Sequence, residues 1–163
     1  MRKRNVAWYE EDFYAWTHEQ AEALRRAARD RVDLTPPLDY ENLADEIESL
    51  GNRDRREICG RLGVLLAHLL KLSHSRVQAP RRVWRRTVLE QRDGLRLVLD
   101  DSPSLQRRMP EFLAKAWPGA RRIAIDVLDE MDGIDATDVP QECPWTTEQV
   151  LDPDFWPVPS ETA

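Results

Sequence analysis

The sequence has few cysteines and no long apolar run. Its two cysteines, Cys59 and Cys143, are too few for a disulfide framework and do not have zinc-finger spacing. No stretch approaches the ~20 apolar residues needed to cross a bilayer, and the basic start, residues 1–6, lacks an apolar region behind it. These absences argue against secretion and membrane insertion, so we expect a cytoplasmic protein in a reducing compartment.

Motifs of common enzyme classes are also absent. There is no phosphate-binding glycine loop, no Gly-x-Ser-x-Gly elbow and no dinucleotide-binding glycine fingerprint. His68 and His74 are six residues apart, which places their rings on different sides of a helix and not at the i, i+4 spacing of helical zinc sites. The sequence therefore predicts no cofactor and carries no positive signature of enzymatic chemistry.

Periodic apolar residues are what the sequence does have. No alternating run is long enough to predict a strand, whereas apolar residues recur every three or four positions over long stretches. The high content of both hydrophobic residues (41%) and charged residues (33%) is typical of long amphipathic helices. We predict an all-α helical bundle of about five helices, forming a single domain over residues 1–163.

The main helical segments are predicted at residues 12–30, 39–75, 81–101 and 103–131. The first could break at Thr17, which has capping-box spacing to Gln20. Asp39 is expected to cap the second segment, and Gly51 indicates a cap, kink or break within it.

The last long segment and the C-terminus contain most of the prolines. One helix is expected over residues 103–131, kinked at Pro110 and Pro118. Residues 133–163 form an irregular C-terminal arm with one short helix, which begins at a capping box formed by Thr146 and Gln149.

Charge is unevenly distributed along the chain. Residues 39–50 contain five acids and no base, whereas residues 76–96 contain seven arginines and two acids. Residues 123–163 contain eleven acids and no lysine or arginine, which explains the formal net charge of −6. The predicted C-terminal arm is therefore strongly acidic.

An arginine cluster surrounds one tryptophan: Arg81, Arg82, Arg85 and Arg86 flank Trp84. Such a patch could bind nucleic acid, because arginines bind phosphate and an exposed indole can stack on a base. Trp84 shares a helical stripe with Val88 and Leu95, however, so we expect it in the core. An acidic molecule also repels phosphate. These features argue against a nucleic-acid partner, and the acidic arm could instead cover the arginine patch.

Polar residues occupy otherwise apolar helical positions at Glu46, His68 and Gln91. Glu46 is expected about 60° from the middle of a stripe formed by Leu43, Ile47 and Leu50. An unpaired buried polar group costs roughly 1 to 3 kcal/mol, so each residue needs a partner if it is buried. Together with an arginine such as Arg85, the three could line a small pocket or form a structural polar network. Glu46 and His68 are the candidate catalytic or metal-binding residues, and Gln91 is a candidate binding residue.

Four sequence motifs, in this order along the chain, resemble those of a known family: Tyr9-Glu-Glu-Asp-Phe-Tyr-Ala-Trp16, Glu41-Asn-Leu-Ala-Asp-Glu-Ile-Glu-Ser-Leu-Gly51, Leu65-Leu-Ala-His-Leu-Leu-Lys71 and Glu142-Cys-Pro-Trp-Thr146. The chain resembles the bacterial family catalogued as domain of unknown function 29. The resemblance covers nearly the whole chain and implies an all-α bacterial cytosolic protein. It implies no activity for this chain, because the family has no established activity.

Three functional interpretations follow. The one we favour is a non-enzymatic interaction or regulatory domain whose partner is a protein or a second copy of the chain. The first alternative is a hydrolase or nuclease-like enzyme that uses Glu46 and His68 with a metal or as an acid–base pair. The second is nucleic-acid binding through the Arg81–Arg86 helix. An accessible pocket shared by Glu46, His68 and Gln91 would favour the enzyme, and an exposed Trp84 would favour nucleic-acid binding.

Overall fold

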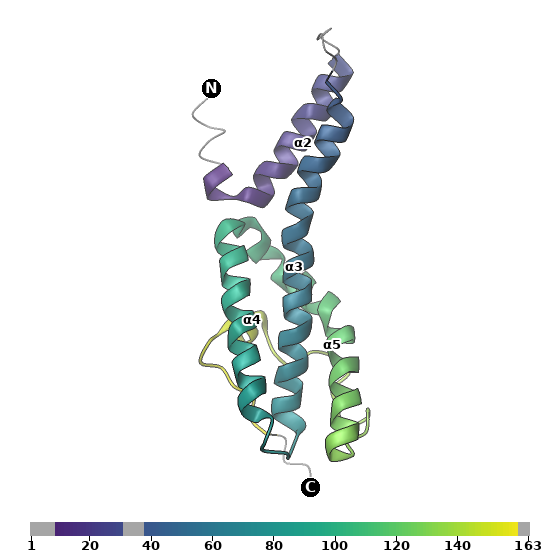
Figure 1. Ribbon diagram of the computed structural model, residues 1–163, viewed down its shortest axis with the longest axis vertical. Helices are drawn as coiled ribbons and strands as arrows, with labels where there is room; N and C mark the ends of the chain where they lie inside the picture. Colours follow the sequence, from purple (N-terminus) through teal and green to yellow (C-terminus); the bar gives the residue numbers. More distant parts are fainter. Residues whose placement is uncertain (1–8, 31–37, 160–163) are drawn as a thin grey trace. The chain divides into compact units, whose positions relative to one another are not determined.

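The computed structural model describes residues 9–30 and 38–159, which are largely helical (Figure 1). The elements are α2 (Phe13–Asp30), α3 (Tyr40–His74), α4 (Arg81–Asp101), the 3-10 helix η1 (Pro103–Arg108), α5 (Met109–Asp132) and α6 (Thr147–Leu151). These two ranges contain no strand, which confirms the predicted all-α fold. Among the described helices, none is both long and apolar enough to span a membrane. The basic start of the chain and the pair Pro36-Pro37 lie outside the described residues.

The chain divides into two compact units. The single domain over residues 1–163 stays a prediction. Unit 1 comprises Met1–Glu57 and Val98–Arg107, and unit 2 comprises Ile58–Leu97 and Arg108–Ala163. Helices α3 and α4 each contribute residues to both units. The units are described one at a time below.

Unit 1 is built on the packing of α2 beside the first part of α3 (Figure 1). Small residues are buried on both helices, Ala21 on α2 and Ala44 on α3. At Gly51 the backbone approaches α2 so closely that an added Cβ would overlap the Thr17 hydroxyl and lie 3.3 Å from the Thr17 Cβ. The helices therefore meet through residues with little or no side chain, which lets their backbones come close.

Two predictions about unit 1 are wrong. Gly51 does not end or interrupt a helix, because α3 continues through it as a single 35-residue element. Thr17 does not break the first segment either: it is buried within α2, and its hydroxyl donates to the Tyr14 carbonyl at 2.8 Å. The break lies at Asp12, whose carboxylate accepts from the Ala15 amide at 2.9 Å and so caps α2. Asp39 caps α3 as predicted, by accepting from the Asn42 amide at 3.1 Å.

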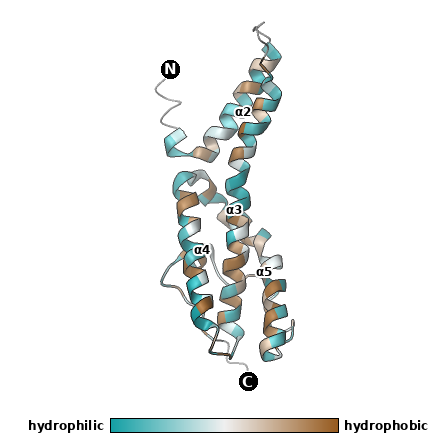
Figure 2. Ribbon diagram, viewed as in Figure 1, coloured by the Kyte–Doolittle hydropathy of each residue, from teal (hydrophilic) through white to brown (hydrophobic). Residues whose placement is uncertain are grey.

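Unit 2 is organised around an apolar stretch of α3. Side chains on nearly every side of this stretch are buried, including Ile58, Leu62, Leu65, Leu66, Leu69, Leu70 and Leu72. Figure 2 shows hydrophobic residues gathered along this part of α3. A helix that is apolar nearly all round must be surrounded, and buried residues of α4 and α5, such as Val88 and Leu128, complete the core.

The segment predicted as one helix over residues 103–131 is two elements. It begins as η1 and changes to α5 at Met109. Pro110 lies in the first turn of α5 and starts the helix instead of kinking it, because the first turn needs no amide donor there. Pro118 does lie inside the helix. Gly133 ends α5 in the left-handed conformation, with φ of 64°.

Two arginines hold the C-terminal arm through its backbone carbonyls. Arg92, which is buried, donates to the carbonyls of Val150 at 2.9 Å and Phe155 at 3.0 Å. Arg121 on α5 donates to the carbonyl of Pro140 at 2.8 Å. Since an irregular segment leaves its carbonyls without helical or sheet partners, these guanidinium groups satisfy them. The predicted short helix of the arm is confirmed as α6, with its capping box at Thr146.

Replacement of Gly51 by alanine tests the close approach of α2 and α3. We expect Gly51→Ala to lower the free energy of unfolding by roughly 1 to 3 kcal/mol, because the new methyl group overlaps Thr17. Gly63→Ala in the same helix is the matched control: nothing lies within 4 Å of its added Cβ, so it should stabilise the protein by about 0.5–1 kcal/mol. Thermal denaturation measures both changes. Equal effects of the two substitutions would contradict this packing.

Arg92→Met should release the C-terminal arm, because several arm carbonyls lose their common donor. Leaving buried carbonyls unsatisfied lowers the free energy of arm opening by about 2 kcal/mol. The open form is then populated tens of times more, and the protease cleaves the arm faster by the same factor. The arm has exposed glutamates at Glu142 and Glu148, so digestion by a glutamate-specific protease reports opening. Arg96→Met, at an exposed position of the same helix, should leave the cleavage rate unchanged. Equal rates for both variants would exclude Arg92 as the anchor.

Candidate functional site

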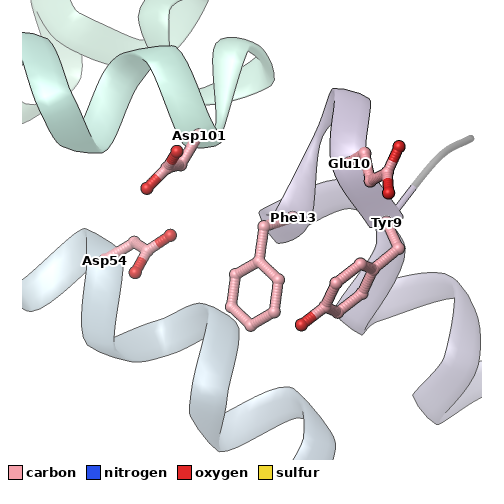
Figure 3. A pocket seen from close by; sticks show the side chains of 5 residues that line it. All are labelled: Tyr9, Glu10, Phe13, Asp54 and Asp101. Carbon is pink, nitrogen blue, oxygen red and sulfur yellow. The ribbon is translucent and has the colours of Figure 1, made fainter.

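A pocket with a distinctive chemistry lies in unit 1. It has a volume of about 460 Å³ and is lined by Tyr9, Glu10, Phe13, Asp54 and Asp101. Figure 3 shows the carboxylates of Asp54 and Asp101 on one side and the rings of Phe13 and Tyr9 on the other. Of the described residues that line it, three are acidic and none is basic, so they place negative charge beside aromatic surface. We refer to it as the acidic–aromatic pocket.

Asp54 is positioned by a buried serine. Ser102, which is fully buried, donates its hydroxyl hydrogen to an Asp54 carboxylate oxygen at 2.8 Å. The same hydroxyl oxygen accepts from the Tyr14 backbone amide at 3.1 Å. Burial raises the pKa of Asp54 above its usual value, and the nearby charges of Glu57 and Asp101 add to this, while the Ser102 hydrogen bond opposes it. Asp54 is therefore a fixed, partly desolvated carboxylate.

The aromatic side of the pocket is held in place from two directions. Tyr9 and Phe13 pack edge to face, with ring centroids 5.8 Å apart, and Trp16 contacts both rings. Asp12, directly before Phe13, accepts from the Ser104 amide at 2.6 Å and from the Ser104 hydroxyl at 3.0 Å. These bonds fix the start of α2 against the segment that follows α4, and so fix the position of the aromatic wall.

This arrangement is suited to binding a cation. Aromatic faces and carboxylates both attract positive charge, and together they suit organic ammonium or guanidinium groups with some apolar surface. The described lining residues include no histidine, cysteine or serine that could act as a base or nucleophile beside the carboxylates. Among residues 9–30 and 38–159, no group of three or more histidine, cysteine, aspartate or glutamate side chains is placed to share a metal ion.

The prediction that Glu46 lies beside an apolar stripe of its helix is wrong. Glu46 is exposed, whereas Ala44 is fully buried. The neighbouring acids Asp45 and Glu48 accept from Arg25 of α2 at 2.9 and 2.6 Å. The buried face of α3 is rotated because the close approach of α2 requires small residues at the contact, and the leucine stripe does not provide them.

The other predicted members of a shared pocket each have a separate partner. His68 binds the Val64 carbonyl through Nδ1 at 2.8 Å, which makes Nδ1 the donor. Gln91 accepts from Arg61 at 3.4 Å, and Arg85 lies over the Trp156 ring at 4.4 Å. Glu46 belongs to unit 1 and His68 to unit 2, and about six turns of α3 lie between them along the chain. The predicted convergence of Glu46, His68 and Gln91 is therefore not observed.

The arginine cluster is engaged within the protein at several points. Trp84 is 6% exposed, so it is a core residue as expected and is not free to stack on a base. Arg81 donates to the carbonyls of Leu72 and Ser75 at the end of α3, at 2.9 and 3.0 Å. Arg86 forms an ion pair with Glu90, while Arg82 is exposed. This placement does not favour a nucleic-acid surface at Arg81–Arg86.

Sequence reasoning missed Lys71, which is only 7% exposed. Its Nζ lies 3.2 Å from His68 Nε2 and 5.4 Å from the centre of the Trp84 ring. Burial lowers the pKa of Lys71, and burial followed by the Lys71 charge lowers the pKa of His68. The i, i+3 spacing of these two residues on a predicted helix was the signal that could have identified the pair.

Lys71→Met should stabilise the protein at neutral pH. The ammonium group is buried without an ion pair to any described acid, so its removal should raise the free energy of unfolding by about 1 kcal/mol. Because the folded-state pKa is lowered, the unfolded chain binds the extra proton, and the gain should shrink as pH rises toward 10.5. Chemical denaturation at a series of pH values measures this, with the exposed Lys115→Met as control. A loss of stability in Lys71→Met would contradict the assignment.

Comparison with known proteins places the chain in a family without a known activity. No curated protein is detectably similar. The crystal structure of an α-helical protein of unknown function from Rhodospirillum rubrum, determined at 1.45 Å resolution, is similar in fold, with a TM-score of 0.70 and 27% sequence identity over 90% of each chain. The family described as "Domain of unknown function DUF29" matches residues 8–156. The resemblance based on the four sequence motifs is thus confirmed, and the chain belongs to the DUF29 family.

Proposed function

We propose that this protein is a non-enzymatic interaction domain, and that the acidic–aromatic pocket of unit 1 binds a cationic group of a partner, such as a lysine or arginine side chain. The observation that carries the proposal is the placement of Asp54 and Asp101 opposite the rings of Phe13 and Tyr9 (Figure 3). A carboxylate pair neutralises the charge of such a side chain, and the rings contact its apolar stem and its cationic face.

Pre-organisation supports this function. The Asp54 carboxylate is already oriented by Ser102, and Phe13 is already fixed through the bonds of Asp12 to Ser104. Little side-chain freedom is then lost when a ligand binds, which favours affinity. The raised pKa of Asp54 points the same way, because a partly desolvated carboxylate beside another acid gains most from an added positive charge.

The chemistry of the pocket also favours binding over catalysis. No histidine or cysteine is among the described residues that line it, and the enzyme candidates Glu46 and His68 have other surroundings. A pocket of about 460 Å³ accommodates the end of one long side chain and part of its backbone. A basic residue presented by a protein partner is therefore the ligand that fits best.

Asp54→Asn should weaken binding of a lysine- or arginine-containing peptide by about tenfold, because a charge-assisted contact is lost while the amide oxygen can still accept from Ser102. Isothermal titration with an arginine peptide, and with the same peptide carrying citrulline, measures the effect and its dependence on charge. Glu46→Gln, an exposed acid in the same unit, is the matched control and should leave affinity unchanged.

The folding consequence of Asp54→Asn separates function from structure. Because the folded-state pKa of Asp54 is raised, the folded state prefers the protonated form, and ionisation costs stability as pH rises through that pKa. Asp54→Asn should therefore fold at least as stably as the wild type at pH 7 while binding less. Equal binding of the arginine and citrulline peptides by the wild type would exclude the proposed function.

A further inference from the structure

A regular seam of exposed residues runs along α4 in unit 2. It comprises Val83, Arg86, Glu90, Asp93 and Leu97, which follow one another at intervals of three, four, three and four. Every member is more than half exposed, from 53% at Val83 to 73% at Arg86. We call these five residues the α4 seam. The spacing is that of positions a and d in a coiled coil, the positions that face a partner helix.

The seam lies away from the core of its own unit. The residues that α4 buries are different ones, including Trp84, Val88 and Leu95. Leu89, beside the seam, is also 42% exposed, so three aliphatic side chains on the outer side of one helix are between 42% and 63% exposed. The seam therefore has an exposed aliphatic side chain at each end and charged side chains between them.

The order of charges along the seam selects the partner and its direction. From its N-terminal end the seam reads apolar, basic, acidic, acidic, apolar. In a parallel pair of identical helices, Arg86 would meet Arg86 and Asp93 would meet Asp93, so every charged contact would be repulsive. In an antiparallel pair centred near Glu90, Val83 meets Leu97 of the second copy and Arg86 meets its Asp93.

We infer that two copies of this protein associate through the α4 seam, with the two α4 helices antiparallel. The sequence of the seam is complementary to its own reverse, as a two-fold symmetric contact requires. The two Glu90 side chains face each other at the axis, and each has an arginine available, since Arg86 of the same helix lies 3.5 Å away and Arg86 of the second copy lies alongside. This inference rests on unit 2 alone and is independent of the proposed cation pocket.

The contact is short, so the dimer is weak. From Val83 to Leu97 the helix rises about 21 Å, and a pair of helices of this length buries less area than a standard protein interface of about 1,600 Å². The dimer therefore forms reversibly as the protein concentration increases, with the apolar ends supplying the attraction and the charges fixing the direction.

The test is sedimentation equilibrium of the full-length protein from about 1 μM to 1 mM, the range in which weak association is visible. Arg86→Asp and Asp93→Arg should each weaken self-association about tenfold or more, since each places like charges opposite one another in both halves of the contact. An equimolar mixture of the two variants should recover association, because one then carries acids and the other arginines at both positions. Arg122→Asp, at an exposed position of α5, is the charge-matched control and should associate like the wild type.

Each other outcome overturns the inference. A wild type that stays monomeric over the whole range excludes the dimer. A dimer that neither substitution weakens uses another surface. Variants that associate poorly alone and equally poorly as a mixture exclude the pairing of Arg86 with Asp93. Circular dichroism of each variant confirms that α4 is intact, so loss of association cannot be ascribed to unfolding.

Discussion

The hydroxyl group of Ser102 joins three segments of unit 1 that are far apart in the sequence. It is fully buried, accepts from the backbone of α2 at Tyr14 and donates to Asp54 of α3. Because a buried hydroxyl needs partners for both its donor and its acceptor, this residue fixes the start of α2, the middle of α3 and the segment after α4 at one point. The acidic–aromatic pocket exists because these segments meet there, with Asp12 and Ser104 making the second link.

Unit 2 is stabilised by other interactions than unit 1. An apolar stretch of α3 is buried on nearly every side, and the irregular C-terminal arm forms part of unit 2, where Arg92 and Arg121 satisfy its carbonyls. The acidic arm contacts the arginine-rich helix through its backbone oxygens and the Trp156 ring. Guanidinium groups suit this role because one group can donate to several carbonyls at once.

Helix positions could be predicted from the sequence wherever local chemistry decided them. The Asp39 cap, the bounds of α4 and the capping box at Thr146 all depend on residues close in the chain, and all are confirmed. The role of Gly51 and the exposure of Glu46 could not be predicted in the same way, because both depend on how closely α2 approaches α3. The pocket was missed for the same reason: the sequence does not reveal that Phe13, Asp54 and Asp101 come together.

The most direct test of this account is the titration of the Asp54 carboxyl by carbon-13 NMR, with and without an alkylguanidinium ligand. The account predicts a pKa above 3.8 in the free protein, because the carboxyl is partly desolvated beside another acid, and a lower pKa when the cation binds. A shift in that direction for Asp54 would place the cation in the pocket. A pKa of Asp54 that the ligand does not change would contradict the account.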